Sequence, residues 1–187
     1  MGDTMRPRPD VRIRSIADGD WDGIAALEAE VYTRLGLSEG RAALESRARA
    51  SPGTCFVLAS GRRTAGYVLA LPYPPFQSPD LARTERAAHS SRNLHLHDLV
   101  VAEDFRGRGL ARRLLRHLTA TARAGAYERM SLVAIGGSET FWSAQGFQGH
   151  REVPLPDGYG TDALYMSAPV PERHSGAGKT EPERRRG

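Results

Sequence analysis

The stretch LHLHDLVVAEDFRGRGLA, residues 94–111, carries the strongest structural signal in the chain. Residues 94–101 are mostly apolar, with histidines and an aspartate interposed, and predict a strand. Residues 107–125 then place leucines at helical spacing and predict an amphipathic helix. Together they describe a strand, a short turn rich in glycine and arginine, and the beginning of a helix.

The turn has the properties of a site for a pyrophosphate. The first amides of a helix have no intrahelical partner, and the helix dipole favours negative charge there. Gly107 and Gly109 lack the side chains that would keep a diphosphate from the amides that lead into Leu110 and Ala111. Arg106 and Arg108 add permanent positive charge.

Three phosphate-binding patterns compete for this chain. The dinucleotide pattern G-x-G-x-x-G fails because Arg112 stands at its third glycine. A P-loop around residues 178–180 fails because Arg173 occupies its first glycine. The coenzyme A turn of acetyltransferases, R/Q-x-x-G-x-G/A, is filled by Arg106, Gly109 and Ala111. An arginine-rich helix cap without a ligand remains an alternative for this motif alone.

Outward from this segment, hydrophobic periodicity and turn residues predict an α/β order of β-α-α-β-β-β-α-β-α-β-β. Strands are expected over residues 11–16, 54–59, 64–71, 94–101, 130–135, 148–154 and 162–168. Helices are expected from residue 18 or 20 onward and over residues 38–49, 107–125 and 138–145. We therefore expect a flexible N-terminus (1–10), one folded domain (11–168) and a disordered basic tail (169–187), whose composition cannot bury enough apolar surface to fold.

Composition excludes several classes of protein. The 187 residues are 40% hydrophobic and 26% charged, as in an ordinary single-domain globular protein. No apolar run approaches the ~20 residues that span a bilayer, and residues 1–10 do not resemble a signal peptide. We expect a cytoplasmic protein without membrane contact.

Cysteine content and charge bear on three further features: disulfides, metal sites and nucleic-acid binding. Cys55 is the only cysteine, which excludes an internal disulfide and leaves no metal-ligand cluster, so no metal is expected. The net charge is +4, but the arginines are scattered and Lys179 is the only lysine. A GC-rich coding bias explains the arginines at least as well as phosphate binding does, and we expect no nucleic-acid partner.

The element order over about residues 11–168 resembles that of the GNAT N-acetyltransferases. Residues 99–101 (LVV) resemble the family's L-x-V strand end, and residues 141–147 (FWSAQGF) resemble its F-Y-x-x-x-G-F helix end. The resemblance implies a mixed, mostly antiparallel central sheet flanked by helices and splayed at strands 4 and 5. It also implies acetyl-CoA as co-substrate, with pantetheine beside Leu99, Val100 and Val101, and with the Val101 amide facing the thioester carbonyl.

His95 and His97 lie two apart on a predicted strand and should point to one face. The segment His-Leu-His-x-Leu-x-Val is similar to that of arylalkylamine N-acetyltransferases, in which the two histidines relay a proton from the amine through water. Histidine titrates near neutral pH and suits this role. Many relatives carry a carboxylate at the position of His97. Asp98 should point to the opposite face and is the weaker candidate.

The sequence departs from the family at the leaving group. In many relatives a tyrosine on the last helix protonates the departing thiolate, and Trp142 stands at that position here. Relatives also often carry an asparagine at the start of this helix, where this chain has Ile135. Trp142 is expected to pack against pantetheine or the core. A neighbouring residue, with Tyr159 and Tyr165 as possible substitutes, or water then protonates the thiolate, or the thiolate leaves unassisted. Cys55 is expected to be buried rather than to carry an acetyl group, so direct transfer in a ternary complex is predicted.

The acceptor pocket is expected from residues 32–37, 73–93 and 154–162, which together offer aromatic and carboxylate side chains. We therefore predict an N-acetyltransferase for a primary amine of a small molecule, acting as a monomer or homodimer. A protein acetyltransferase would instead have an open groove, whereas the proline-rich residues 72–79 suggest a lid. A catalytically silent CoA-binding regulatory module is favoured by Trp142 and opposed by the two histidines. Nucleic-acid binding through residues 169–187 is the last alternative.

Overall fold

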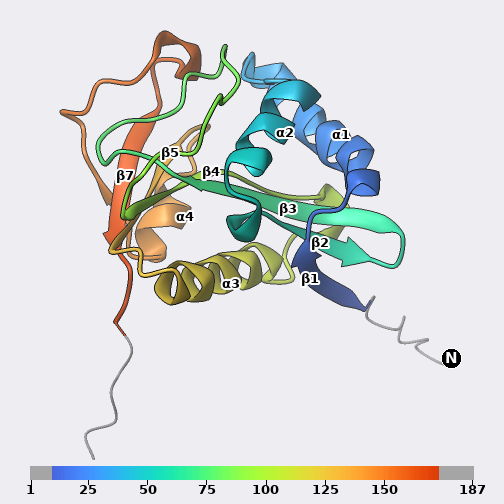
Figure 1. The fold of residues 1–187 in the computed structure, drawn as a ribbon. Coiled ribbons are helices and arrows are strands. Elements are labelled where there is room, and N and C mark those ends of the chain that lie inside the picture. The colour runs from blue at the N-terminus through green and yellow to red at the C-terminus, as the bar shows by residue number, and fades with distance from the viewer. Residues whose placement is uncertain (1–9, 173–187) are drawn as a thin grey trace, which may run out of the picture.

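A computed structural model describes residues 10–172, which form a mixed α/β fold (Figure 1). The strands are β1 (Val11–Ser15), β2 (Phe56–Ser60), β3 (Arg63–Pro72), β4 (Asn93–Val101), β5 (Arg129–Ala134), β6 (Gln148–Gly149) and β7 (Leu164–Pro169). The α-helices are α1 (Trp21–Tyr32), α2 (Arg41–Ala50), α3 (Leu110–Ala124) and α4 (Glu139–Ala144). Residues 1–9 and 173–187, which hold most of the two expected terminal segments, lie outside the described residues.

Within residues 10–172, seven strands form one sheet in the order β1-β2-β3-β4-β5-β7-β6. Neighbouring strands are antiparallel except β4 and β5, which are parallel. Helices α1 and α2 cover one face of the sheet, and α3 and α4 lie on the other (Figure 1). The expected fold class, a mostly antiparallel sheet with flanking helices, is confirmed.

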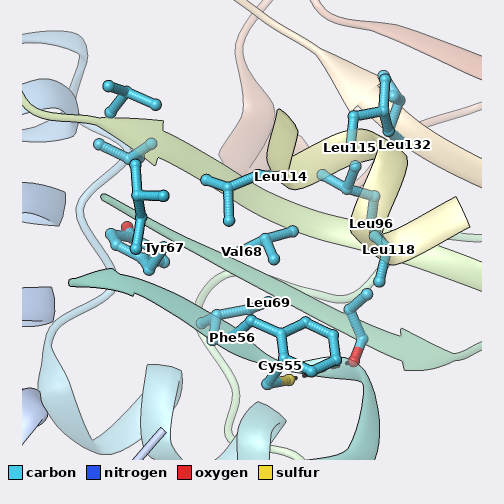
Figure 2. Close-up of a cluster of buried hydrophobic side chains, with 14 of the residues drawn as sticks. Cys55, Phe56, Tyr67, Val68, Leu69, Leu96, Leu114, Leu115, Leu118 and Leu132 are labelled. Atoms are coloured by element: carbon cyan, nitrogen blue, oxygen red, sulfur yellow. Dashed lines mark hydrogen bonds between the residues drawn. The ribbon is translucent and has the colours of Figure 1, made fainter. Parts of the chain in front are cut away.

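The main core lies between the sheet and α3, whose leucines were expected to share one face. Leu114 and Leu118 are fully buried and point toward Val68 and Leu96 of the central strands (Figure 2). Burying a leucine side chain contributes roughly 1.5–3 kcal/mol. This packing fixes α3, and therefore its first turn, against the end of β4. None of the helices in the described part of the chain has the length and apolarity to cross a bilayer.

Three predicted elements differ clearly from the structure, one of them the helix expected over residues 38–49, which is α2 and begins at Arg41. The strand expected over residues 148–154 is only Gln148–Gly149, because the Val153 amide turns back to the His150 carbonyl and prolines follow. The helix expected from residue 107 begins at Leu110, because Gly107 and Gly109 adopt φ of 73° and 71°. Those left-handed conformations break the helical path and form the turn instead.

The sheet splays between β4 and β5. The two strands pair only from Asn93↔Arg129 to His95↔Ser131, although β4 continues to Val101 and β5 to Ala134. On its other side, β4 contains a bulge. Leu69 pairs with Asp98 and Ala70 with Leu96, so His97 is the extra residue. The opening and the bulge occur next to each other and define the region of the site.

Candidate functional site

The splayed edge of β4 presents backbone groups that β3 does not use. The Ala102 amide donates to the Ala65 carbonyl (2.9 Å), and the register then pairs Val100 with Tyr67. Because hydrogen-bonded and non-bonded pairs alternate in an antiparallel ladder, Leu99 and Val101 direct their backbone groups away from β3. They face the opening toward β5, where an extended ligand can pair with them.

The glycine-arginine turn lies at the end of this edge. Arg106 donates Nε to the Val101 carbonyl (3.1 Å), which joins the turn to β4. Arg108 turns back, donating to the Asp104 carbonyl (3.1 Å) and lying over the Phe105 ring. An added Cβ at Gly107 or Gly109 would meet no described atom within 4 Å, so the space above the turn is open. The helical hydrogen bonds of α3 begin with the Arg113 amide, which donates to the Gly109 carbonyl. The amides just before Arg113 therefore have no helical partner and are available to an anion.

A cavity of about 400 Å³ occupies the opening. It brings together the predicted residues His97, Leu99, Val100, Val101, Arg106, Ala111 and Trp142. His95, Gly107, Arg108, Gly109 and Leu110 are not among its lining residues. Leu110 is buried beneath the turn, and the two glycines shape the turn itself. The cavity therefore extends from the first turn of α3 along β4 to His97.

His97 is held by Glu39, a residue that the sequence reading missed. His97 Nε2 forms a short hydrogen bond with Glu39 Oε1, and both side chains are nearly inaccessible to solvent. Burial alone would raise the pKa of Glu39, but His97 and Arg47 outweigh it and lower the pKa. Among the described residues, His97 Nδ1 has no partner. Glu39 lies 58 residues away in the sequence, and no local motif pointed to it.

His95 sits deeper than His97, toward the paired part of β4. Its Nδ1 is 2.9 Å from Ser131 Oγ, which also accepts from Asn93 Nδ2 at 2.8 Å. The ring centroids of His95 and His97 are 6.4 Å apart. Burial, followed by the nearby His97 and Arg47, lowers the pKa of His95 well below its usual value. Burial thus favours the uncharged form of the His95 imidazole, which lies behind the cavity wall.

The expectation that Asp98 points away from His97 is wrong. Because His97 is the bulged residue, the two successive side chains lie on the same side and line the same cavity. The Asp98 carboxylate accepts from Tyr32 Oη (2.5 Å) and from Tyr67 Oη. Burial nevertheless raises its pKa to about 6, against the effect of the two tyrosine hydroxyls. Asp98 is thus a second titratable group beside His97.

The three segments expected to form the acceptor end do contribute to it. Leu35 and Leu37 come from residues 32–37, Leu81 from 73–93 and Tyr159 from 154–162. The acidic residues expected from these segments (Asp80, Glu85, Asp157 and Asp162) do not line the cavity. Its carboxylates are Glu28, Glu39 and Asp98 instead. Across the described part of the chain, Arg106 is the only arginine or lysine in the lining, and it stands at the α3 end.

The three side chains at or near the position of a proton donor to the CoA thiolate differ in their access to the cavity. Trp142 lines the cavity and packs edge-on against Phe141 and Phe147. Tyr159 lines it too, but its hydroxyl donates to the Pro79 carbonyl (2.8 Å), and burial raises its pKa. Tyr165 is not a lining residue, and its hydroxyl accepts from the Phe76 amide.

Cys55 does not contribute to the cavity. It is buried directly before β2 begins, and its thiol donates to the Ala70 carbonyl (3.3 Å). Burial raises the pKa of this thiol to about 12, so the nucleophilic thiolate is strongly disfavoured. Both observations agree with a structural thiol.

The model of the acetyltransferase (GNAT) family matches residues 21–147. Comparison with curated proteins gives no match. Many solved structures are similar in fold.

Three of these structures illustrate the similarity. The loading GNATL domain of CurA from Lyngbya majuscula has a TM-score of 0.71 and 15% identity, covering 86% of this chain and 98% of that one. N-acetylglutamate synthase from Neisseria gonorrhoeae, complexed with coenzyme A and N-acetyl-glutamate, has a TM-score of 0.68 and 18% identity, covering 88% and 36%. Ard1 from Thermoplasma volcanium has a TM-score of 0.66 and 16% identity, covering 87% and 99%. At these identities the similarity concerns the fold alone.

Proposed function

The chain belongs to the acetyltransferase (GNAT) family, and from that premise we propose that it transfers the acetyl group of acetyl-CoA to a primary amine of a small molecule. The amine attacks directly in a ternary complex. One observation carries the proposal: a single cavity joins the free edge of β4, the first turn of α3 and the His97–Glu39 pair. The cavity thus has room for the pyrophosphate at α3, for the pantetheine arm along β4 and for the amine beside His97.

The residues at the turn fit the phosphates of acetyl-CoA. Free amides at the start of α3 and the open space over Gly107 and Gly109 suit a pyrophosphate. Arg106 and Arg108 supply positive charge close to it. From there the pantetheine arm would run along β4 and pair with the outward backbone groups of Leu99 and with the Val101 amide, since the Val101 carbonyl already accepts from Arg106.

Distance along β4 favours Leu99 over Val101 as the amide that stabilises the thioester oxyanion. A strand rises ~3.3 Å per residue, so Leu99 is roughly 7 Å along β4 from His97, whereas Val101 is roughly 13 Å away. The base must reach the attacking nitrogen directly or through one water. We therefore assign the oxyanion contact to the Leu99 amide and a pantetheine contact to Val101.

His97 is the proposed base. Its Nε2 is engaged by Glu39, which fixes the ring, and its Nδ1 has no partner within residues 10–172. Through a water, Nδ1 can take the proton from the ammonium, after which the free amine attacks the carbonyl carbon. His95, kept neutral by burial, acts in this relay only as a hydrogen-bonding group.

In the tetrahedral intermediate the attacking nitrogen carries an extra proton, which it gives to water, and collapse then breaks the carbon–sulfur bond and releases the CoA thiolate. We propose that it leaves unassisted and takes a proton from solvent. Trp142 has no acidic proton at working pH, and the Tyr159 hydroxyl is already committed to a carbonyl. A thiolate is stable enough to leave without an acid, which makes a dedicated donor unnecessary.

Charge supports an amine of low molecular weight. At its acceptor end the cavity presents Glu28, Glu39 and Asp98 together with leucines, which suits an ammonium group with an apolar body. Leu81, from the loop between β3 and β4, lines one side of the cavity, and a loop at this place favours a small acceptor over a protein segment. The His97–Glu39 pair also argues against a catalytically silent module.

The proposal is tested by thiol release from acetyl-CoA across matched acceptors. The set consists of 2-phenylethylamine, L-phenylalanine and L-phenylalanine methyl ester, with a lysine-containing peptide as the protein substrate. We expect turnover with the amine and the ester, and little with the zwitterion or the peptide. Calorimetry with CoA should show binding. A protein that binds acetyl-CoA but acetylates none of these acceptors contradicts the enzyme assignment, and preference for the peptide contradicts the small-molecule assignment.

A further inference from the structure

Arg47, on α2, is fully buried and does not line the cavity. Its guanidinium donates Nε to Glu39 Oε2 (3.0 Å) and Nη1 to Glu85 Oε1 (2.9 Å), and Nη2 also contacts Glu39. A buried guanidinium is tolerated only when paired and hydrogen-bonded in this way. The three side chains therefore form one unit, named here the Arg47 cluster (Arg47, Glu39 and Glu85).

The cluster ties part of the loop between β3 and β4 to α2. Arg47 Nη2 donates to the carbonyls of Asp80 (3.1 Å) and Arg83 (3.3 Å). The Glu85 amide adds a bond to Ser46 Oγ (2.9 Å), also on α2. Leu81, within the same segment, lines the cavity. Docking of residues 80–85 on α2 thus forms part of the cavity wall.

The same cluster reaches the proposed base through one carboxylate. Glu39 Oε1 forms a hydrogen bond with His97 Nε2, while Glu39 Oε2 accepts a hydrogen bond from Arg47 Nε. A carboxylate fixed at one oxygen by a planar guanidinium has a defined orientation at the other. The position of His97 is therefore connected to the loop by three successive side-chain contacts.

We propose that Arg47 is a positioning residue that couples docking of residues 80–85 to the orientation of His97, so that the base is aligned when the loop covers the cavity. This rests on the proposed function, because it assigns a role toward the His97 base. Arg47 touches neither the cavity nor His97, and it acts through Glu39. The charged and titratable groups around His97 are Glu39, His95, Asp98 and, further away, Glu28, Arg47, Tyr32, Tyr67 and Tyr159.

The pH dependence of kcat distinguishes this role from a merely structural one. Arg47→Met removes the positive charge that neutralises Glu39, so the acidic limb of the kcat profile moves to higher pH. Glu85→Gln leaves Arg47 less compensated and moves the limb to lower pH. We expect shifts on the order of half a pH unit in these opposite directions. Arg49→Met, an exposed change on the same helix, should not move the limb.

Hydrogen exchange tests the coupling without any need for turnover. In the full chain, Glu39→Gln should accelerate amide exchange of residues 80–85 about tenfold, because Arg47 loses a charged partner. Glu45→Gln, in a surface ion pair on α2, is the control. Glu85→Gln retains the other guanidinium contacts and should fold. If the acidic limb of its kcat profile does not move, the proposal is overturned. Unchanged exchange in Glu39→Gln overturns it as well, whereas absence of turnover in the wild type contradicts only the acetyltransferase proposal.

Discussion

The hydroxyl of Tyr32 donates a 2.5 Å hydrogen bond to Oδ1 of Asp98, joining residues 66 positions apart in the sequence. Tyr67 donates to Oδ2 of the same carboxylate. These two bonds replace part of the hydration that Asp98 loses on burial, yet its pKa is still raised to about 6. An ionised Asp98 is therefore costly to the fold while it contributes negative charge to the acceptor end of the cavity.

This relationship predicts how stability depends on pH. The folded pKa of Asp98 lies above its value of 3.8 in the unfolded chain, so the folded state binds more protons between about pH 4 and pH 6. The associated stability is present below pH 4 and is lost as the pH rises through about 6. Asp98→Asn should therefore gain free energy of unfolding relative to the wild type over this range. Denaturant titrations at several pH values measure it, and an exposed control, Asp22→Asn, should follow the wild type.

His97→Ala should lower kcat by about 10²–10⁴-fold, because the proposed role of His97 is proton transfer. Affinity for acetyl-CoA should change little, since the residue stands at the far end of the cavity from the first turn of α3. Steady-state kinetics together with calorimetry measure the two effects separately. His117→Ala, exposed on α3, is the matched control. Wild-type kcat in His97→Ala would remove the assignment of the base.

Gly109→Val should weaken CoA binding by roughly tenfold or more. Gly109 has φ of 71°, where a β-branched side chain is strained, and the new side chain would enter the space above the turn. Gly61→Val imposes a comparable strain at φ of 58° in the turn between β2 and β3. Both variants should lose stability, but only Gly109→Val should lose affinity in a calorimetric titration. Equal CoA affinities would contradict a cradle at the start of α3.

Trp142→Phe should retain kcat within about twofold. Trp142 packs against Phe141 and Phe147, and phenylalanine keeps an aromatic ring in that place. Because neither side chain can supply a proton, unassisted departure of the thiolate predicts an unchanged rate of the chemical step. Pre-steady-state thiol release measures that step. A large loss of rate would show that the indole N–H serves the reaction.

Glu28→Gln should raise KM for an amine acceptor about tenfold with a smaller change in kcat. Glu28 is buried and lines the cavity, and its carboxylate accepts from Ser38 Oγ (2.7 Å) and the Glu39 amide (2.6 Å). Removing its charge weakens attraction for an ammonium group. Glu30→Gln, exposed two residues further along α1, serves as the comparison. Identical KM values in the two variants would place the ammonium elsewhere.

The sequence by itself determined the strand–turn–helix that begins at β4. Leucine spacing fixes which face of α3 is buried, and the glycines at 107 and 109 permit the left-handed turn that precedes it. These are local properties, since periodicity and allowed φ values depend on neighbouring residues only. The fold class was readable from the order of elements over residues 11–168, and the family from that order together with the motifs in residues 94–111 and 141–147.

Only the tertiary structure decided what surrounds His97. The bulge that turns Asp98 to the same side depends on how β4 registers with β3, which alternation along one strand does not predict. Glu39 and Arg47 come from a segment more than 40 residues earlier, and they meet the site because α2 packs on the sheet. Contacts across such separations follow from packing of the whole domain, and a charged residue in a polar segment carries no sign of its future partner.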